Sequence, residues 1–256
     1  MEKDPFRNIF IQQHLSFQGG TPNYDLYHQK LSVLESANSL TSSVVFIHDF
    51  YTGLNPYFSN FPIYLTGYSA DELSAFGEEL FQQLYSARDL EFISNVEVKM
   101  NDIISSICPE RQSSFVITLS INLVHKDGHL VPVYVYFSPF LFDDNNRVWM
   151  LIGRMTFSIK QDVYENILYI DLLDSNERYI YNRINENFDL IMRPVLTHME
   201  KSVLVLCTRG YLEKEVAREM NISINTVKTH KRNFLRKLEA ENISQAFIMA
   251  GIHKLI

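Results

Sequence analysis

Apolar and polar residues alternate along four stretches in the first two thirds of the chain. Residues 42–50, SSVVFIHDF, alternate and are rich in β-branched and aromatic side chains, as strands are. Three longer alternating runs follow at 114–126, 129–142 and 147–158. Polar turns separate these runs, first Asp127-Gly128 and then residues 143–146. The pattern predicts one strand followed, after an interval, by an antiparallel meander of three.

The interval before the meander has helical spacing. After Thr52-Gly53 the chain is expected to form short helical pieces, and Ser69 lies three residues before Glu72, the spacing of a capping box. Asp89 is expected to cap a longer helix. The apolar residues of that helix are Ile93, Val96, Met100, Ile103 and Ile107. Together these elements predict an α+β domain, an antiparallel sheet with flanking helices.

Two segments border this domain. Residues 1–40 place Leu26, Leu31 and Leu34 at helical spacing, which predicts a helical flank that could pair two protomers. Residues 161–194 predict a hairpin around residues 174–176. That hairpin either extends the sheet, braces the following domain or is a passive spacer.

After Pro194 the apolar residues recur with the spacing of α-helices. Thr197 and Glu200 have the spacing of a capping box, and Gly210 has the backbone freedom that helix ends often need. A second helix is expected over about 212–220, and Ser223 is placed to cap a third over 224–238. The result is a small all-α domain of four helices.

The third helix has two unlike faces. Its apolar arc holds Ile224, Val227, Phe234, Leu235 and Leu238. Its polar arc holds Asn225, Thr226, Lys228, Thr229, Arg232, Asn233 and Arg236. Residues 221–238 contain no Asp or Glu. A helix-turn-helix with a basic third helix is typical of proteins that read the major groove of DNA.

Charge separates the chain into the same two parts. Residues 1–195 hold 13 Lys and Arg against 24 Asp and Glu, a balance of −11, whereas residues 196–256 hold 10 against 6, a balance of +4. Together they give the net charge of −7. A basic module on an acidic chain favours a polyanionic partner for that module.

Composition and motifs argue against a metalloprotein, a membrane protein and an enzyme. Cys108 and Cys207 have no CxxC spacing and no histidine cluster beside them, so no zinc site or other metal site is expected. Thiols this sparse indicate a reducing compartment, here the cytoplasm. Neither a signal peptide nor an apolar run of about 20 residues is present, so no membrane partner is expected. No phosphate loop, GxSxG or HExxH motif indicates an enzyme.

The C-terminal part resembles the LuxR-type helix-turn-helix, which begins with Leu-Thr-x-x-Glu and carries Thr-Val-Lys-x-His in its recognition helix. The similarity lies in LTHME at 196–200, VLVLCTRGYLEKEVAREM at 203–220, NISINTVKTH at 221–230 and RKLEAENISQA at 236–246. Met199, Leu212 and Lys231 depart from the family's usual residues. The resemblance implies that Lys228, Thr229 and Arg232 contact bases. It implies phosphate contacts from Thr226, Lys231, Asn233, Arg236 and Lys237. It also implies that the last helix, about 244–253, forms a dimer contact.

Residues 41–160 resemble a PAS domain through LTGYSADEL at 65–73, SARDL at 86–90 and KDG at 126–128. PAS domains commonly bind a small ligand between sheet and helices, or mediate dimerisation and relay. No cofactor is indicated, because the flavin-binding Asn-Cys-Arg-Phe-Leu stretch is absent and His48 and His125 are expected to be packed or surface residues rather than haem ligands. The aromatic residues of the meander either line a pocket or fill the core: Tyr134, Tyr136, Phe137, Phe140 and Trp149.

The expected domains are therefore a helical flank (1–40), a PAS-like sensory domain (41–160), a connecting segment (161–194) and a LuxR-type helix-turn-helix domain (195–256). The expected function is a sequence-specific transcription regulator that binds double-stranded DNA as a homodimer. Two alternatives stay open. One is a response regulator with a receiver-like domain, in which Asp49 would lie at a strand end. The other is a PAS-mediated interaction scaffold without DNA.

Overall fold

The computed structural model describes residues 21–38, 43–59, 62–107, 114–158, 166–252 and 255–256. The chain divides into two compact units, Met1–Ile191 and Met192–Ile256. Each has its own buried core. Cys108 and the N-terminal residues 1–20 lie outside the described residues.

The first unit is built on one sheet whose eight described strands follow the order β2-β1-β5-β4-β3-β6-β7-β8. The pairs whose register is defined are all antiparallel. The strands are β1 (Val44–Asp49), β2 (Leu54–Phe58), β3 (Phe115–Val124), β4 (Leu130–Phe142), β5 (Val148–Phe157), β6 (Leu168–Leu172), β7 (Glu177–Asn182) and β8 (Asn187–Met192). The expected α+β fold with a three-strand meander, β3 to β5, is confirmed. A receiver-like arrangement is wrong, because that fold needs parallel strands joined by crossover helices.

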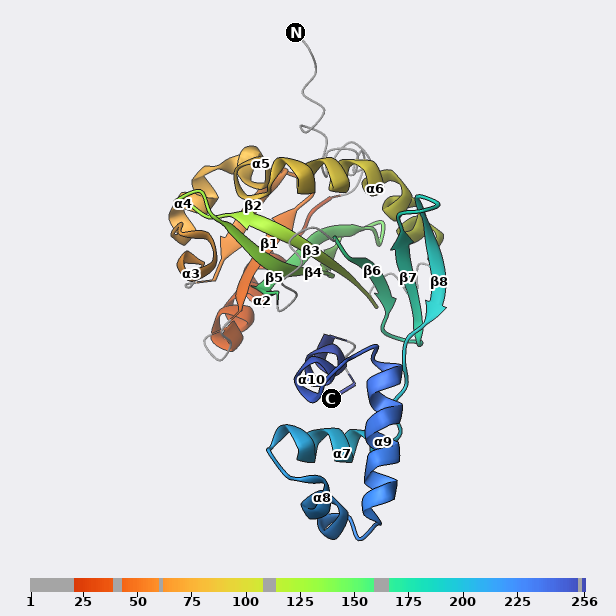
Figure 1. The fold of residues 1–256 in the computed structure, drawn as a ribbon. Helices are drawn as coiled ribbons and strands as arrows, with labels where there is room; N and C mark the ends of the chain where they lie inside the picture. Colours follow the sequence, from red (N-terminus) through yellow and green to blue (C-terminus); the bar gives the residue numbers. More distant parts are fainter. Residues whose placement is uncertain (1–20, 39–42, 60–61, 108–113, 159–165, 253–254) are drawn as a thin grey trace. The chain divides into compact units, whose positions relative to one another are not determined.

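Helices cover the sheet and close its core. They are α2 (Tyr24–Asn38), α3 (Ile63–Thr66), α4 (Ala70–Ala75), the 3-10 turn η2 (Gly77–Glu79), α5 (Leu80–Leu84) and α6 (Ala87–Ser106). Figure 1 shows α5 and α6 along one face of the sheet, with α2 away from them. The expected capping box at the start of α4 is present, since Glu72 N–H donates to Ser69 Oγ and Ser69 N–H donates to Glu72 Oε2.

Helix α2 is fixed to the sheet by a buried carboxylate. Successive residues of a strand face opposite sides, so His48 packs against Phe81 of α5 while Asp49 faces α2. Asp49 accepts hydrogen bonds of 2.8 Å from Tyr24 Oη and from Trp149 Nε1. Since Asp49 is buried, these donors replace water around its charge. They also join α2, β1 and β5.

Asp89 has a different role from the expected one. Helix α6 begins after Ser86, whose hydroxyl oxygen accepts the N–H of Asp89, so the prediction that Asp89 caps this helix is wrong. The Asp89 carboxylate instead accepts the Ser86 hydroxyl at 2.6 Å and the Asn122 N–H at 2.9 Å. It therefore ties the start of α6 to β3, a partner 33 residues away that sequence spacing does not reveal.

The edges of the sheet also differ from expectation. Residues 54–58, expected to be helical, form the edge strand β2, which accommodates Pro56 because an edge strand needs fewer donors. Residues 168–192 form three strands that extend the sheet beyond β3, rather than one hairpin. A buried ion pair holds the first two together. Arg178 Nε and Nη2 lie 2.6 and 2.8 Å from the two carboxylate oxygens of Asp171.

The second unit consists of α7 (His198–Thr208), α8 (Glu213–Glu219), α9 (Ile224–Lys237) and α10 (Ile243–Ile252). Thr197 and Glu200 form the expected capping box of α7, and Ser223 caps α9 by accepting the Thr226 N–H. Val227 and Phe234 of α9 and Leu238 at its C-terminal cap are buried, as expected. The small all-α fold is confirmed.

Two ion pairs join α9 to its neighbours. Lys237 Nζ lies 2.7 Å from Glu200 Oε2 of α7, and Lys231 Nζ lies 3.1 Å from Glu213 Oε1 of α8. Glu200 is buried, and the same oxygen also accepts the Thr197 N–H. Burial raises the pKa of Glu200, but the hydrogen bonds from Lys237 and Thr197 outweigh burial and hold that pKa below its ordinary value of 4.5.

The start of α8 lacks a side-chain cap, because Leu212 occupies the capping position. Leu212 is 59% exposed, so replacing it removes little buried surface. We expect Leu212→Ser to stabilise the second unit by about 1 kcal/mol, since a serine hydroxyl can accept an N–H of the first turn and a leucine side chain cannot. Slower amide hydrogen exchange in α8 of the full chain measures the gain. Leu212→Ala is the control, and equal protection in both variants would show that no cap forms.

Acid should weaken the second unit through Glu200. A carboxyl group whose pKa is lowered by folding stabilises the fold above its unfolded value, and that contribution is lost as the pH falls through the folded value. We expect Lys237→Met to cost about 1–3 kcal/mol near neutral pH, because Glu200 loses a donor. The variant should also lose less stability than the wild type below pH 4.5.

Urea unfolding followed by circular dichroism at several pH values tests this expectation. Lys228→Met is the control, since Lys228 is exposed on the same helix and has no carboxylate partner among the described residues. Identical acid profiles for wild type and Lys237→Met would contradict the role of the pair.

Candidate functional site

The polar side of α9 carries an exposed basic stripe, defined here as Lys228, Thr229, Arg232 and Arg236. All four side chains are exposed. Lys228, Arg232 and Arg236 are spaced by four residues, so they lie one above another on the helix surface. The structure therefore brings together the three residues expected at bases and one of those expected at phosphates. Thr229 donates its hydroxyl to the Asn225 carbonyl at 3.0 Å, which leaves its methyl group for apolar contact.

The other residues expected at phosphates are half-buried. Lys231 and Lys237 each have a carboxylate partner inside the unit, Glu213 and Glu200 respectively. The Thr226 hydroxyl lies 2.9 Å from that of Ser223. Asn233 completes this half-buried group. Arg236 is thus the exposed cation of the expected phosphate set, whereas Lys231 and Lys237 also hold the helices together.

The apolar side of α9 begins one turn later than expected. Ile224 was placed with the packing residues, but it is 44% exposed, so that prediction is wrong. It is the first residue of the helix, and the buried positions start at Val227. The first turn of α9 contains no acidic residue. The first turn and the stripe beyond it form a surface without carboxylates, suited to a phosphate backbone.

The first unit encloses an apolar cavity of about 60 Å³ between α6 and the sheet. At roughly 10–15 Å³ for each water, this space holds several water-sized groups. Its lining is almost wholly apolar: Phe50, Tyr85, Ile93, Val96, Met100, Ile104, Phe115, Ile117, Leu119, Phe137, Val148, Leu151 and Leu168. Among the aromatic residues considered from the sequence, Phe137 lines this cavity, while Trp149 donates to Asp49 instead.

Tyr85 is the polar residue of the cavity, and sequence reasoning missed it. It follows α5, where its backbone bridges to Leu123 of β3 and its N–H donates to Phe81 O at 2.9 Å. The side chain is 3% exposed, and its hydroxyl has no hydrogen-bond partner in the described structure. Burial, helped by the charge of Asp89, raises its pKa. A lone tyrosine between two helices has no periodic pattern that could have identified it.

The two histidines considered as haem ligands have protein partners. His48 is buried, and its Nδ1 lies 3.2 Å from Asn55 Oδ1, so it is a packed core residue as expected. His125 lies at the turn between β3 and β4, where its Nδ1 is 2.9 Å from Asp127 Oδ1. Among the described helices, none is both long and apolar enough to cross a membrane.

In sequence, the second unit resembles known proteins. Residues 194–250 match the family model of bacterial regulatory proteins, luxR family. The response regulator protein VraR of Staphylococcus saprophyticus is 41% identical over 75 residues, which are 29% of this chain and 35% of VraR. VraR of Staphylococcus aureus strain NCTC 8325 gives the same identity and coverage. The match thus spans about a third of the length of these relatives.

Two solved structures resemble this chain more weakly, at lower sequence identity. A Vibrio cholerae VqmA dimer, described as a LuxR-type receptor, is 16% identical, with 89% of this chain and 88% of that one covered and a TM-score of 0.34. A PAS domain from Colwellia psychrerythraea is 21% identical, with 51% and 98% covered and a TM-score of 0.38. Both scores are below 0.5, so the architecture of the first unit rests on its own strand order and connections.

The family match lies within the C-terminal unit. The 57 matched residues, 194 to 250, include the capping box of α7, the turn at Ser223 and the basic third helix. Residues 194–250 form a helix-turn-helix domain of the luxR family of bacterial regulatory proteins.

Proposed function

We propose that this chain is a cytoplasmic transcription regulator that binds a specific duplex DNA sequence through α9 and responds to a small ligand held in its first unit. The observation that carries the DNA-binding part is the exposed basic stripe on the third helix of a LuxR-family domain. Arg and Lys can bond guanine O6 and N7, and a threonine methyl can contact that of thymine. Lys228, Thr229 and Arg232 are the residues proposed for these base contacts.

Two copies are proposed to bind a roughly palindromic site. Helix-turn-helix dimers place their recognition helices about one DNA turn, roughly 34 Å, apart. Helix α10 suits the dimer contact, because Phe247 on its surface is exposed although apolar. Neutralised phosphates would supply most of the affinity, so binding should weaken steeply as salt rises.

Arg232 and Arg236 provide a matched pair for testing the interface, since both are exposed and lie one turn apart. The operator is first selected from a random duplex library with the full chain. We expect Arg232→Ala to cost about 1–3 kcal/mol at the operator and less on random DNA, so that specificity falls. Arg236→Ala should weaken both alike and reduce the salt slope by about one.

Fluorescence anisotropy with operator and random duplexes at several salt concentrations measures both effects. An unchanged specificity ratio in Arg232→Ala would remove that residue from base recognition. Absence of binding to any duplex at low salt would favour the alternative, an interaction scaffold that does not bind DNA.

The ligand part of the proposal rests on the cavity and on Tyr85. An apolar lining without charged groups suits an uncharged, largely apolar molecule. The unpaired hydroxyl of Tyr85 would bond one polar atom of that molecule and so orient it. Such a ligand regulates DNA binding only if it binds one arrangement of the protein better than another.

Tyr85→Phe tests this role with two opposite effects. Without ligand, we expect the variant to gain about 1 kcal/mol of stability, because an unpaired buried hydroxyl is removed. Acetone, which is small enough for the cavity, should bind the wild type more tightly than the variant by about 0.5–1.5 kcal/mol. Isobutene, which has a similar shape but no carbonyl acceptor, should not distinguish the two proteins.

Thermal unfolding and calorimetric titration measure the two effects. Tyr24→Phe is the control, since its hydroxyl donates to Asp49 and its loss should destabilise the first unit. A destabilised Tyr85→Phe would mean that the hydroxyl already has a partner in solution.

A further inference from the structure

The turn between β3 and β4 places three side chains with metal-binding atoms on one side. His125 N–H donates to His129 O at 2.9 Å, and Gly128 N–H donates to His125 O at 2.7 Å. Gly128 has a φ of 93°, which suits a residue without a side chain at the end of a tight turn. His125 and His129 are thus paired across the hairpin, and paired residues point to the same face. Asp127 lies at the tip between them.

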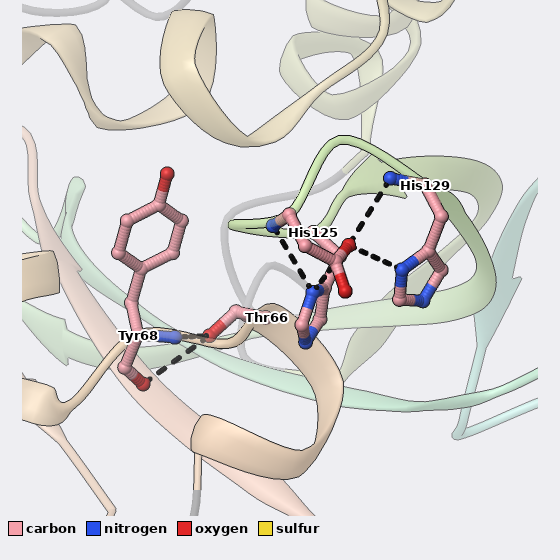
Figure 2. A network of polar contacts seen from close by, with 5 residues as sticks. Thr66, Tyr68, His125 and His129 are labelled. Carbon is pink, nitrogen blue, oxygen red and sulfur yellow. Dashed lines mark hydrogen bonds and ion pairs between the residues drawn. The ribbon is translucent and has the colours of Figure 1, made fainter.

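The three side chains converge on one point. Both imidazoles direct Nδ1 to the same oxygen, Asp127 Oδ1, with His125 at 2.9 Å and His129 in direct contact. The two rings are stacked, with centroids 4.4 Å apart and planes inclined by 26° (Figure 2). One ligand atom from each of the three residues lies within 4.8 Å of the others.

The neighbouring segment fixes one side of this cluster and leaves the other open. A Cβ on Gly67 would lie 2.6 Å from His125 Cε1, so the imidazole packs directly on the glycine backbone. Lys126 N–H donates to Thr66 O at 2.9 Å, which ties the turn to the end of α3. The His125 side chain is 20% exposed, whereas those of Asp127 and His129 are 64% and 58% exposed. Packing therefore fixes the His125 side chain, whereas the exposed Asp127 and His129 side chains can change rotamer.

We propose that His125, Asp127 and His129 bind a divalent first-row transition-metal ion, such as Zn²⁺ or Cu²⁺, through two imidazole nitrogens and one carboxylate oxygen. This mixed nitrogen and oxygen set suits those ions, whereas Mg²⁺ and Ca²⁺ prefer oxygen ligands alone. Water completes the coordination. The ion is distinct from the DNA-binding surface, and its presence does not depend on the function proposed above.

The charges around the cluster are compatible with a cation. Asp127 Oδ1 accepts the backbone N–H of His129 at 3.3 Å, and the Asp127 side chain is 64% exposed, so an ion can reach its carboxylate. The ammonium of Lys126 is occupied elsewhere, because its Nζ lies 2.5 Å from Glu72 Oε1 and 5.2 Å from the centre of the Tyr68 ring. Asp127 therefore has its charge available for an ion.

Binding requires only a small movement. Two ligands at about 2.1 Å from a tetrahedral ion lie roughly 3.4 Å apart. His125 Nδ1 and Asp127 Oδ1 are 2.9 Å apart, so this pair must open by about half an ångström. The contact between His129 and Asp127 is shorter and must open further, which the exposure of both side chains allows. No metal site was expected from the sequence, because cysteine spacing and isolated histidines gave no indication of one. The alternate spacing His-x-Asp-x-His in a hairpin was the available signal.

Calorimetric titration of the untagged full chain with Zn²⁺ alone tests the proposal. We expect one ion per chain, and an affinity at least about tenfold lower in His129→Ala and in Asp127→Asn. His28→Ala is the control and should match the wild type, because His28 is an exposed histidine on α2. Added Mg²⁺ or Ca²⁺ should not compete.

Electron paramagnetic resonance with Cu²⁺ gives a second readout. The wild type should show coupling to two imidazole nitrogens, and His129→Ala to one. Equal Zn²⁺ affinity in wild type and His129→Ala, or no saturable binding below about 1 mM, would overturn the proposal and leave an ordinary polar turn.

Discussion

Burial of one side of α9 is the constraint on which the proposed DNA-reading surface depends. Val227, Phe234 and Leu238 are packed among the helices of the second unit and have almost no exposed surface. Because a helix has a fixed period, burying these residues forces Lys228, Thr229 and Arg232 outward. The apolar side therefore decides which residues can meet a duplex, and the absence of Asp and Glu from residues 221–238 keeps that surface attractive to phosphate.

Cations of this helix have two different roles. Lys231 and Lys237 pair with Glu213 and Glu200, and so help to hold α9 against α8 and α7. Arg232 and Arg236 are exposed and have no carboxylate partner in the described part of the chain. A count of positive charges in the segment would treat all of them as DNA contacts. Their partners show that part of the charge stabilises the unit, since a buried carboxylate needs donors to remain ionised.

Buried carboxylates organise the first unit in the same way. Asp49 joins α2 to β1 and β5, Asp89 joins α6 to β3, and Asp171 joins β6 to β7 through Arg178. Each accepts several hydrogen bonds, which makes its position specific. Tyr85 differs, because its buried hydroxyl faces an apolar cavity and has no hydrogen-bond partner among the described residues. A polar group left unpaired in an otherwise satisfied core is a reasonable place for a ligand to bind.

The sequence by itself determined the elements whose causes are local. The capping boxes at Ser69 and Thr197, the cap at Ser223, the meander and the exposed positions of α9 all follow from spacing within a few residues. Only the tertiary structure decided the strand β2, the sheet extension, the partner of Asp89, the ion pairs of Lys231 and Lys237, and the cavity around Tyr85. These features depend on residues far apart in the chain, whose contacts no periodicity encodes. The His125–Asp127–His129 cluster lies between the two cases: its residues are neighbours in sequence, but only the closed hairpin directs both imidazoles to one carboxylate oxygen.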